Sequence, residues 1–202
     1  MGILSAAVGV TRYRVVDPVP GDFWSWAADR VAARAFRERE PDTAERRSGW
    51  AAVAHPLEEG VTLADMAFGD YLVLALRVDE RRLPAAVLKK HCLREEARVA
   101  AETGRRRLPR QHRAEIRERV RRSLLARALA VPKTADFTWH VSTGQVLFLS
   151  CQTGLREAFE DLFLRTFERR LHPVVPYLLA QELLPDVDRR RALAELRAEV
   201  LV

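Results

Sequence analysis

Apolar residues run together, or alternate with polar ones, in several short stretches, which is the pattern of β-strands. Residues 70–78 (DYLVLALRV) are apolar enough to form a central strand of a sheet. Residues 137–142 (FTWHVS) and 145–150 (QVLFLS) flank Thr143-Gly144 and predict a β-hairpin. Further strands, of which the last is short, are predicted at residues 3–16, 49–54 and 174–175.

Between these strands, apolar residues recur at the spacing of amphipathic helices. Helices are predicted at residues 23–39, 84–103, 109–130, 153–170 and 186–201. Pro84 and Gly104 suit the two ends of the second helix, and Pro109 and Pro132 suit those of the third. Strands and helices do not alternate regularly, so the expected class is α+β: mostly antiparallel sheet with packed amphipathic helices and a basic helical pair.

Composition and length bound the organisation of the chain. The 202 residues are 48% hydrophobic, which is enough for a core, and 31% charged. We expect an α+β region over residues 1–180, with two lobes at about 1–80 and 81–180 as an alternative division, and a charged C-terminal helix over 181–202. No apolar run approaches the roughly 18 residues of a membrane span, and the first residues lack a basic leader, so a cytoplasmic protein is expected.

The positive charge is concentrated in the predicted helical pair. Residues 81–127 contain 16 Lys or Arg and 5 Asp or Glu, a balance of +11, whereas the whole chain carries +6 and the remainder therefore −5. Such asymmetry is typical of a protein that meets a polyanion. The segment contains no aromatic residue on which bases could stack, which favours the backbone of duplex DNA over single strands.

Within the pair, the apolar positions predict the seam between the two helices. They are Val87, Leu88, Cys92, Val99 and Ala100 in the first helix and Ile116, Val120, Leu124 and Ala128 in the second. Arginines recur every four residues on another face of the second helix, where they could follow several phosphates over about 30 Å. The candidate DNA-binding residues are Lys89, Lys90, Arg105, Arg106, Arg107, Arg110, Arg113, Arg117 and Arg121. The alternative is a solvated basic face, partly paired to Glu115 and Glu118.

Catalytic motifs are missing from the sequence. It contains no GxxxxGK[ST], GxGxxG, HExxH or GxSxG pattern. Many nucleases place a lysine two residues after an acid on a strand, but Lys89, Lys90 and Lys133 have no such acid. The five histidines are scattered, and Cys92 and Cys151 are expected to be free thiols. We therefore expect a protein that is not an enzyme and needs no cofactor or metal.

Several motifs of the basic segment and its sequel occur together in one known family. They are Leu83-Pro84, Val87-Leu88-Lys89, Gly104-Arg105, the run Leu124 to Ala128, the strands Phe137 to Val141 and Val146 to Ser150, and Glu157-Ala158-Phe159. In these motifs the chain resembles the RdgC family of bacterial recombination-associated proteins, over about residues 1 to 180. One departure is Leu125-Ala126-Arg127, where the family has Leu-Pro-Arg; without that proline the helix is expected to run further.

The resemblance implies a nucleoid-associated protein that binds double-stranded DNA with little sequence preference and restrains RecA-type recombinase filaments. The family's long form is a dimer closed into a ring around DNA. Because this chain is shorter, ring closure is in doubt if the missing part makes one of the two contacts that close it. A homodimer is expected, and an open two-fold dimer could still form. Two alternatives to this function are a DNA exonuclease, as the family is sometimes described, and a protein-interaction module whose basic face meets an acidic partner.

Overall fold

The computed structural model describes residues 2–3, 5–38, 43–104, 106–184 and 186–196. Within these ranges, seven strands form one antiparallel sheet in the order β2-β4-β5-β6-β1-β7, with β3 paired to β4 outside that path. The strands are β1 (Thr11–Arg14), β2 (Arg46–Ala51), β3 (Ala67–Phe68), β4 (Tyr71–Glu80), β5 (Val131–His140), β6 (Gln145–Phe148) and β7 (His172–Pro173). The predicted α+β class is confirmed.

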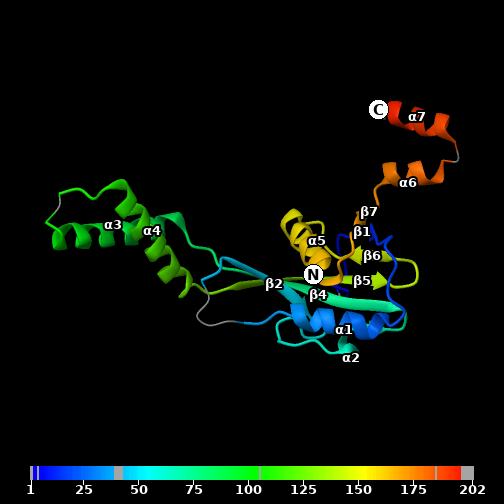
Figure 1. Ribbon diagram of the computed structural model, residues 1–202, viewed down its shortest axis with the longest axis horizontal. Coiled ribbons are helices and arrows are strands. Elements are labelled where there is room, and N and C mark those ends of the chain that lie inside the picture. Colours follow the sequence, from blue (N-terminus) through cyan, green and yellow to red (C-terminus); the bar gives the residue numbers. More distant parts are fainter. Residues whose placement is uncertain (1, 4, 39–42, 105, 185, 197–202) are drawn as a thin grey trace.

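The helices are α1 (Phe23–Arg34), α2 (Leu63–Met66), α3 (Ala85–Glu102), α4 (Arg110–Leu125), α5 (Thr153–Phe167), α6 (Pro176–Leu183) and α7 (Val187–Glu195). Figure 1 shows α1 and α5 against the sheet, whereas α3 and α4 project from one end of it and α6 and α7 stand away from another side. We call α3 and α4 together the arm. The arm is inserted between β4 and β5, which pair over their whole lengths from Tyr71↔His140 to Glu80↔Val131.

The core lies between one face of the sheet and helices α1 and α5. Apolar side chains alternate along β4 and meet a cluster of aromatic rings from both helices and the neighbouring strands. Phe148 and Phe159 stack at 4.3 Å between ring centroids, and Phe137 lies 5.0 Å from Phe159. Trp50 is fully buried and donates a 2.8 Å hydrogen bond from Nε1 to Oγ1 of Thr166, so the indole nitrogen is satisfied inside the core.

The other face of β4 buries a charged network beside the apolar residues Val73 and Ala75. Arg77 is 4% exposed; its Nε and an Nη bond the two carboxylate oxygens of Asp79 at 2.9 Å. The guanidinium also donates to Glu38 at 2.8 Å and to the carbonyl oxygen of Leu57 at 2.6 Å, and it lies over the ring of Phe36. These partners satisfy the buried cation and fasten two loops to the sheet.

Two elements near the start of the chain are shorter in the structure than predicted. Of the strand predicted at 3–16, the structure has only Thr11–Arg14, because the preceding segment turns over the sheet and the backbone N–H of Ile3 bonds the buried Asp136 at 2.8 Å. The helix predicted at 23–39 ends at Arg34. Ala35 is extended there, and Phe36 donates its backbone N–H to the carbonyl oxygen of Trp50 at 2.8 Å.

Other boundaries move because of strand pairing. The strand β5 begins at Val131, ahead of the predicted residue 137, since it follows β4 to the end. The helix predicted at 109–130 ends at Leu125, and the chain turns after it at Ala126. The absence of the family's proline at this point therefore does not lengthen the helix. The last predicted helix, 186–201, is Val187–Glu195 within the described residues. The elements α2, β3 and α6 were not predicted from the sequence pattern.

Candidate nucleic-acid interface

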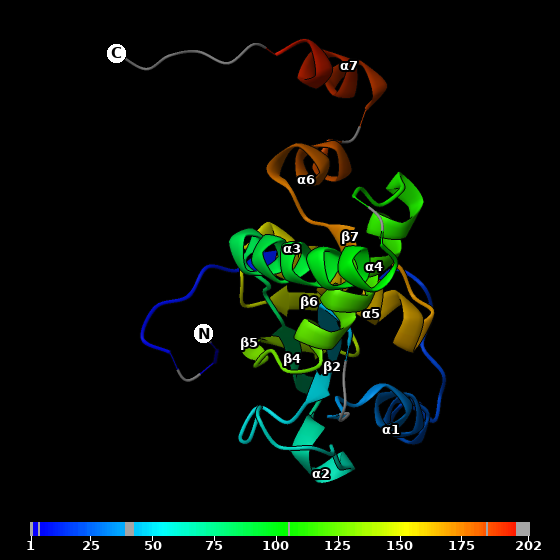
Figure 2. The same ribbon diagram turned by 90° about the vertical axis from the view of Figure 1, so that its left-hand side faces the viewer.

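The arm is a helical hairpin that protrudes from the sheet, with α4 returning alongside α3 (Figures 1 and 2). Gly104 has φ +62 directly after α3, a left-handed conformation that ends the helix and turns the chain, as predicted. The seam buries Cys92 from α3 and Ile116 from α4, and Leu108 is buried at the connection. Other residues expected in the seam are less enclosed, because two helices alone cannot cover each other's apolar stripes fully.

One side of the arm is neutralised by ion pairs. Glu95 of α3 accepts hydrogen bonds from Arg98 at 2.8 Å and from Arg119 of α4 at 2.6 Å, so the second contact joins the helices. Arg98 also pairs with Glu102. The hydrogen bond and charge of Arg98, with those of Arg119, lower the pKa of Glu95 to about 2. We call Glu95, Arg98, Glu102 and Arg119 the paired face.

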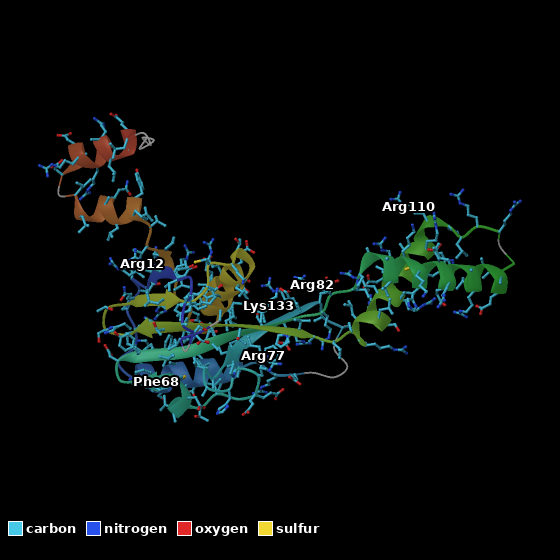
Figure 3. All side chains as sticks on the ribbon, turned by 180° about the vertical axis from the view of Figure 1, so that it is seen from behind. Arg12, Phe68, Arg77, Arg82, Arg110 and Lys133 are labelled. Atoms are coloured by element: carbon cyan, nitrogen blue, oxygen red, sulfur yellow. The ribbon has the colours of Figure 1, made fainter. Side chains whose placement is uncertain are left out.

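The other side of the arm carries four cations that pair with no acid among the described residues. Lys89, Arg110, Arg113 and Arg117 line a groove of about 580 Å³ between α3 and α4, and none of the four has an ion pair to a residue that the structure describes. We call these four residues the open face. Arg117 and Arg119 are two residues apart on one helix, which turns them to opposite sides, so α4 supplies both faces. Figure 3 shows Arg110 on the arm, well away from the sheet.

A family model whose description reads "Putative exonuclease, RdgC" matches residues 10–181 of the chain. The chain belongs to the RdgC family. The matched range includes all seven strands and the whole arm. A search of curated proteins found no match.

The arm of this RdgC-family chain gathers only part of the predicted basic row. Four of the nine candidate residues form the open face. Arg121, one turn beyond Arg117, instead pairs with Glu45 at 2.7 Å and lies 3.8 Å from Glu118. The remaining candidates are exposed but lie outside the groove: Lys90 on α3, and Arg106 and Arg107 in the connection between the helices. Arg105 lies outside the described residues.

A second basic cluster, which was not predicted from the sequence, lies at the root of the arm. Lys133 lies 2.8 Å, Arg82 3.3 Å and Arg46 3.9 Å from the carboxylate of Glu80, and Lys133, as the leading cause, lowers the pKa of this group. Three cations around one carboxylate leave the cluster positive; Figure 3 labels Arg82 and Lys133 there. Arg82 is close to Glu80 in sequence, but only the register of β2, β4 and β5 brings Arg46 and Lys133 to the same carboxylate, so the local sequence could not have indicated the cluster.

Two further findings concern what the described residues lack. They contain no group of three or more His, Cys, Asp or Glu side chains placed to hold a metal ion. Among the helices of the same part of the chain, none has both the length and the apolar character needed to cross a membrane.

Proposed function

We propose that this RdgC-family chain binds double-stranded DNA without sequence preference through the open face of its arm. The observation that carries the proposal is the contrast between two faces of one hairpin: acids neutralise the cations of one face, and those of the other have no acidic partner in the part of the chain that the structure describes. Arginine forks suit phosphate oxygens, and contacts to phosphates position DNA without reading its bases. The cluster at the root, which includes Lys133, would extend the contact toward the sheet.

The biological role follows from occupancy of the duplex. A nucleoid-associated protein that covers DNA backbone competes with a RecA-type recombinase for the same strands, and so restrains filament activity and modulates homologous recombination. In this proposal the protein is cytoplasmic, acts as a homodimer and does not cut DNA. The second candidate, an exonuclease, is favoured by the description of the family.

The proposal is tested by neutralising two cations on either face and comparing the variants. Arg113→Gln with Arg117→Gln removes two open-face cations; Arg98→Gln with Arg119→Gln removes the same charge from the paired face. Binding of unrelated duplexes is measured over a range of salt. We expect the open-face variant to lower the slope of log affinity against log salt by about 1.8, since each phosphate contact on duplex DNA contributes about 0.9.

The paired-face variant is expected to keep a slope close to that of the parent protein. Equal losses in both variants would show that binding follows net charge alone, and the assignment of the open face would be wrong. Labelled duplex incubated with protein and Mg²⁺ should stay intact. Progressive shortening from the ends would favour the exonuclease instead.

A further inference from the structure

The groove of the open face contains apolar surface that phosphate binding does not use. Leu93 is 57% exposed at its edge, and Leu88, Cys92 and Ala114 also line it. A single exposed leucine is ordinary on a protein surface. Leu93, however, borders a groove whose other lining residues include four cations without acidic partners among the described residues, so apolar and positive surface occur together.

Charge complementarity decides between the possible occupants of this groove. The backbone of duplex DNA presents charged phosphates outward and offers little apolar surface to cover Leu93. A second copy docked face to face would bring Arg113 and Arg117 toward the same cations of its partner, which costs free energy. An acidic amphipathic helix supplies both requirements, with apolar residues at three- and four-residue spacing and carboxylates beside them.

The lining residues also indicate how such a helix would lie. Three cations, Arg110, Arg113 and Arg117, come from α4, whereas α3 contributes Lys89 and the acid Glu96. The carboxylates of the occupant are therefore expected on the side of α4. Its apolar stripe would lie against Leu88 and Leu93, completing a three-helix packing around the seam.

We propose that the open-face groove binds an acidic amphipathic helix of a partner protein. The helix buries the side chain of Leu93 and pairs its carboxylates with Arg113 and Arg117. Because these cations are also those proposed to contact phosphates, the partner and DNA exclude each other on the arm. The Leu93 contact belongs to the helix alone, which separates this proposal from the DNA-binding one.

The test uses a synthetic probe, because the partner is identified only by its chemistry. The probe is a fluorescent helical peptide of Glu and Leu in amphipathic order; a scrambled peptide of the same composition is the control. We expect the ordered peptide to bind and the scrambled one to bind at least about tenfold more weakly, the usual scale for losing a buried leucine contact. Equal binding of the two would overturn the proposal.

Variants of Leu93 locate the contact. Leu93→Gln, or Leu93→Ala if the first variant folds poorly by circular dichroism, adds no charge beside the cations of the groove. It should weaken the ordered peptide about tenfold and leave the affinity for duplex DNA within about twofold. Leu164→Gln is the matched control, since Leu164 is a 45% exposed leucine on helix α5. The proposal fails if the Leu93 variants bind the peptide like the parent protein. It also fails if they halve the mass measured by light scattering, since a second copy would then cover Leu93.

Discussion

Asp136 shows how a single residue ties the first residues of the chain to the sheet. It lies on β5, on the face opposite the aromatic core, and its side chain is 7% exposed. Its Oδ2 accepts the backbone N–H of Ile3 at 2.8 Å. Burial raises the pKa of this carboxyl above its usual 3.8, although the bond to Ile3 lowers it. The hydrogen bond therefore does not offset the loss of water around the charge.

The raised pKa of Asp136 predicts a pH dependence of stability. The folded protein binds the proton more tightly than the unfolded chain, so this contribution is complete below about pH 3.8 and is lost as pH rises through the folded pKa. In Asp136→Asn the residue no longer titrates. We expect the free energy of unfolding of the parent protein, minus that of the variant, to fall as pH rises above 3.8. Urea unfolding at a series of pH values measures it; a difference that stays constant or rises would contradict the prediction.

The sequence could not have indicated this role for Asp136. The residue that it bonds lies 133 positions away, and a lone Asp between Ala135 and Phe137 reads as the polar position of an alternating strand. The same holds for Arg77, whose partners come from three separate segments. Local pattern predicts that a residue is in a strand, whereas its contacts depend on the fold.

At the scale of elements, the two faces of the arm differ in electrostatics. On the paired face, Arg98 and Arg119 hold Glu95 in its charged form. Titration of the Glu95 carboxyl, followed by NMR of its side-chain carbon, is expected to have its midpoint at about 2. In Arg98→Gln the midpoint should move up toward 4.5, the ordinary value for Glu, because Arg98 is the largest cause of the shift.

The direction of the pKa shift of Glu95 predicts the pH range in which the ion pairs of the paired face are lost. The pKa of Glu95 is lower in the folded protein, so its stabilising contribution is present above pH 4.5 and disappears as pH falls toward 2. A midpoint near 4.5 in the parent protein would mean that Glu95 does not join the two helices in solution. Glu95 would still be ionised at neutral pH, but Arg98 and Arg119 would not be held by it and would be as accessible as the cations of the open face.

Periodic elements were predictable from the sequence, and their pairing was not. The run at β4, the helix α5 and both helices of the arm have strong patterns with Gly or Pro near several ends, and they were predicted within a few residues. The row of arginines on α4 was also visible in the sequence. Its division into the open-face arginines and the paired Arg121 was not. Whether a cation stays free depends on which acids lie nearby, and Arg121 meets Glu45, which precedes β2.

At the scale of the whole molecule, a few contacts hold the arm to the sheet. The backbone N–H of Arg81 donates to the carbonyl oxygen of Glu45 at 2.8 Å. The side chain of Arg81 donates from Nε to the carbonyl oxygen of Ala128 at 3.2 Å. Beyond these, the 2.7 Å pair of Arg121 and Glu45 joins α4 to the segment before β2. Glu45 thus neutralises Arg121, the cation of the α4 row that is nearest to the sheet. Arg121 lies between the open face and the cluster around Glu80.

That position predicts that Glu45 limits DNA binding. In Glu45→Gln the carboxylate no longer competes for Arg121, so one more cation can reach a phosphate. If DNA binds the open face, we expect higher affinity and a slope of log affinity against log salt that is steeper by about 0.9. Glu102→Gln is the matched control, because it removes the same charge from the paired face and leaves Arg121 engaged. Identical slopes in the two variants would mean that added net charge, rather than release of Arg121, strengthens binding.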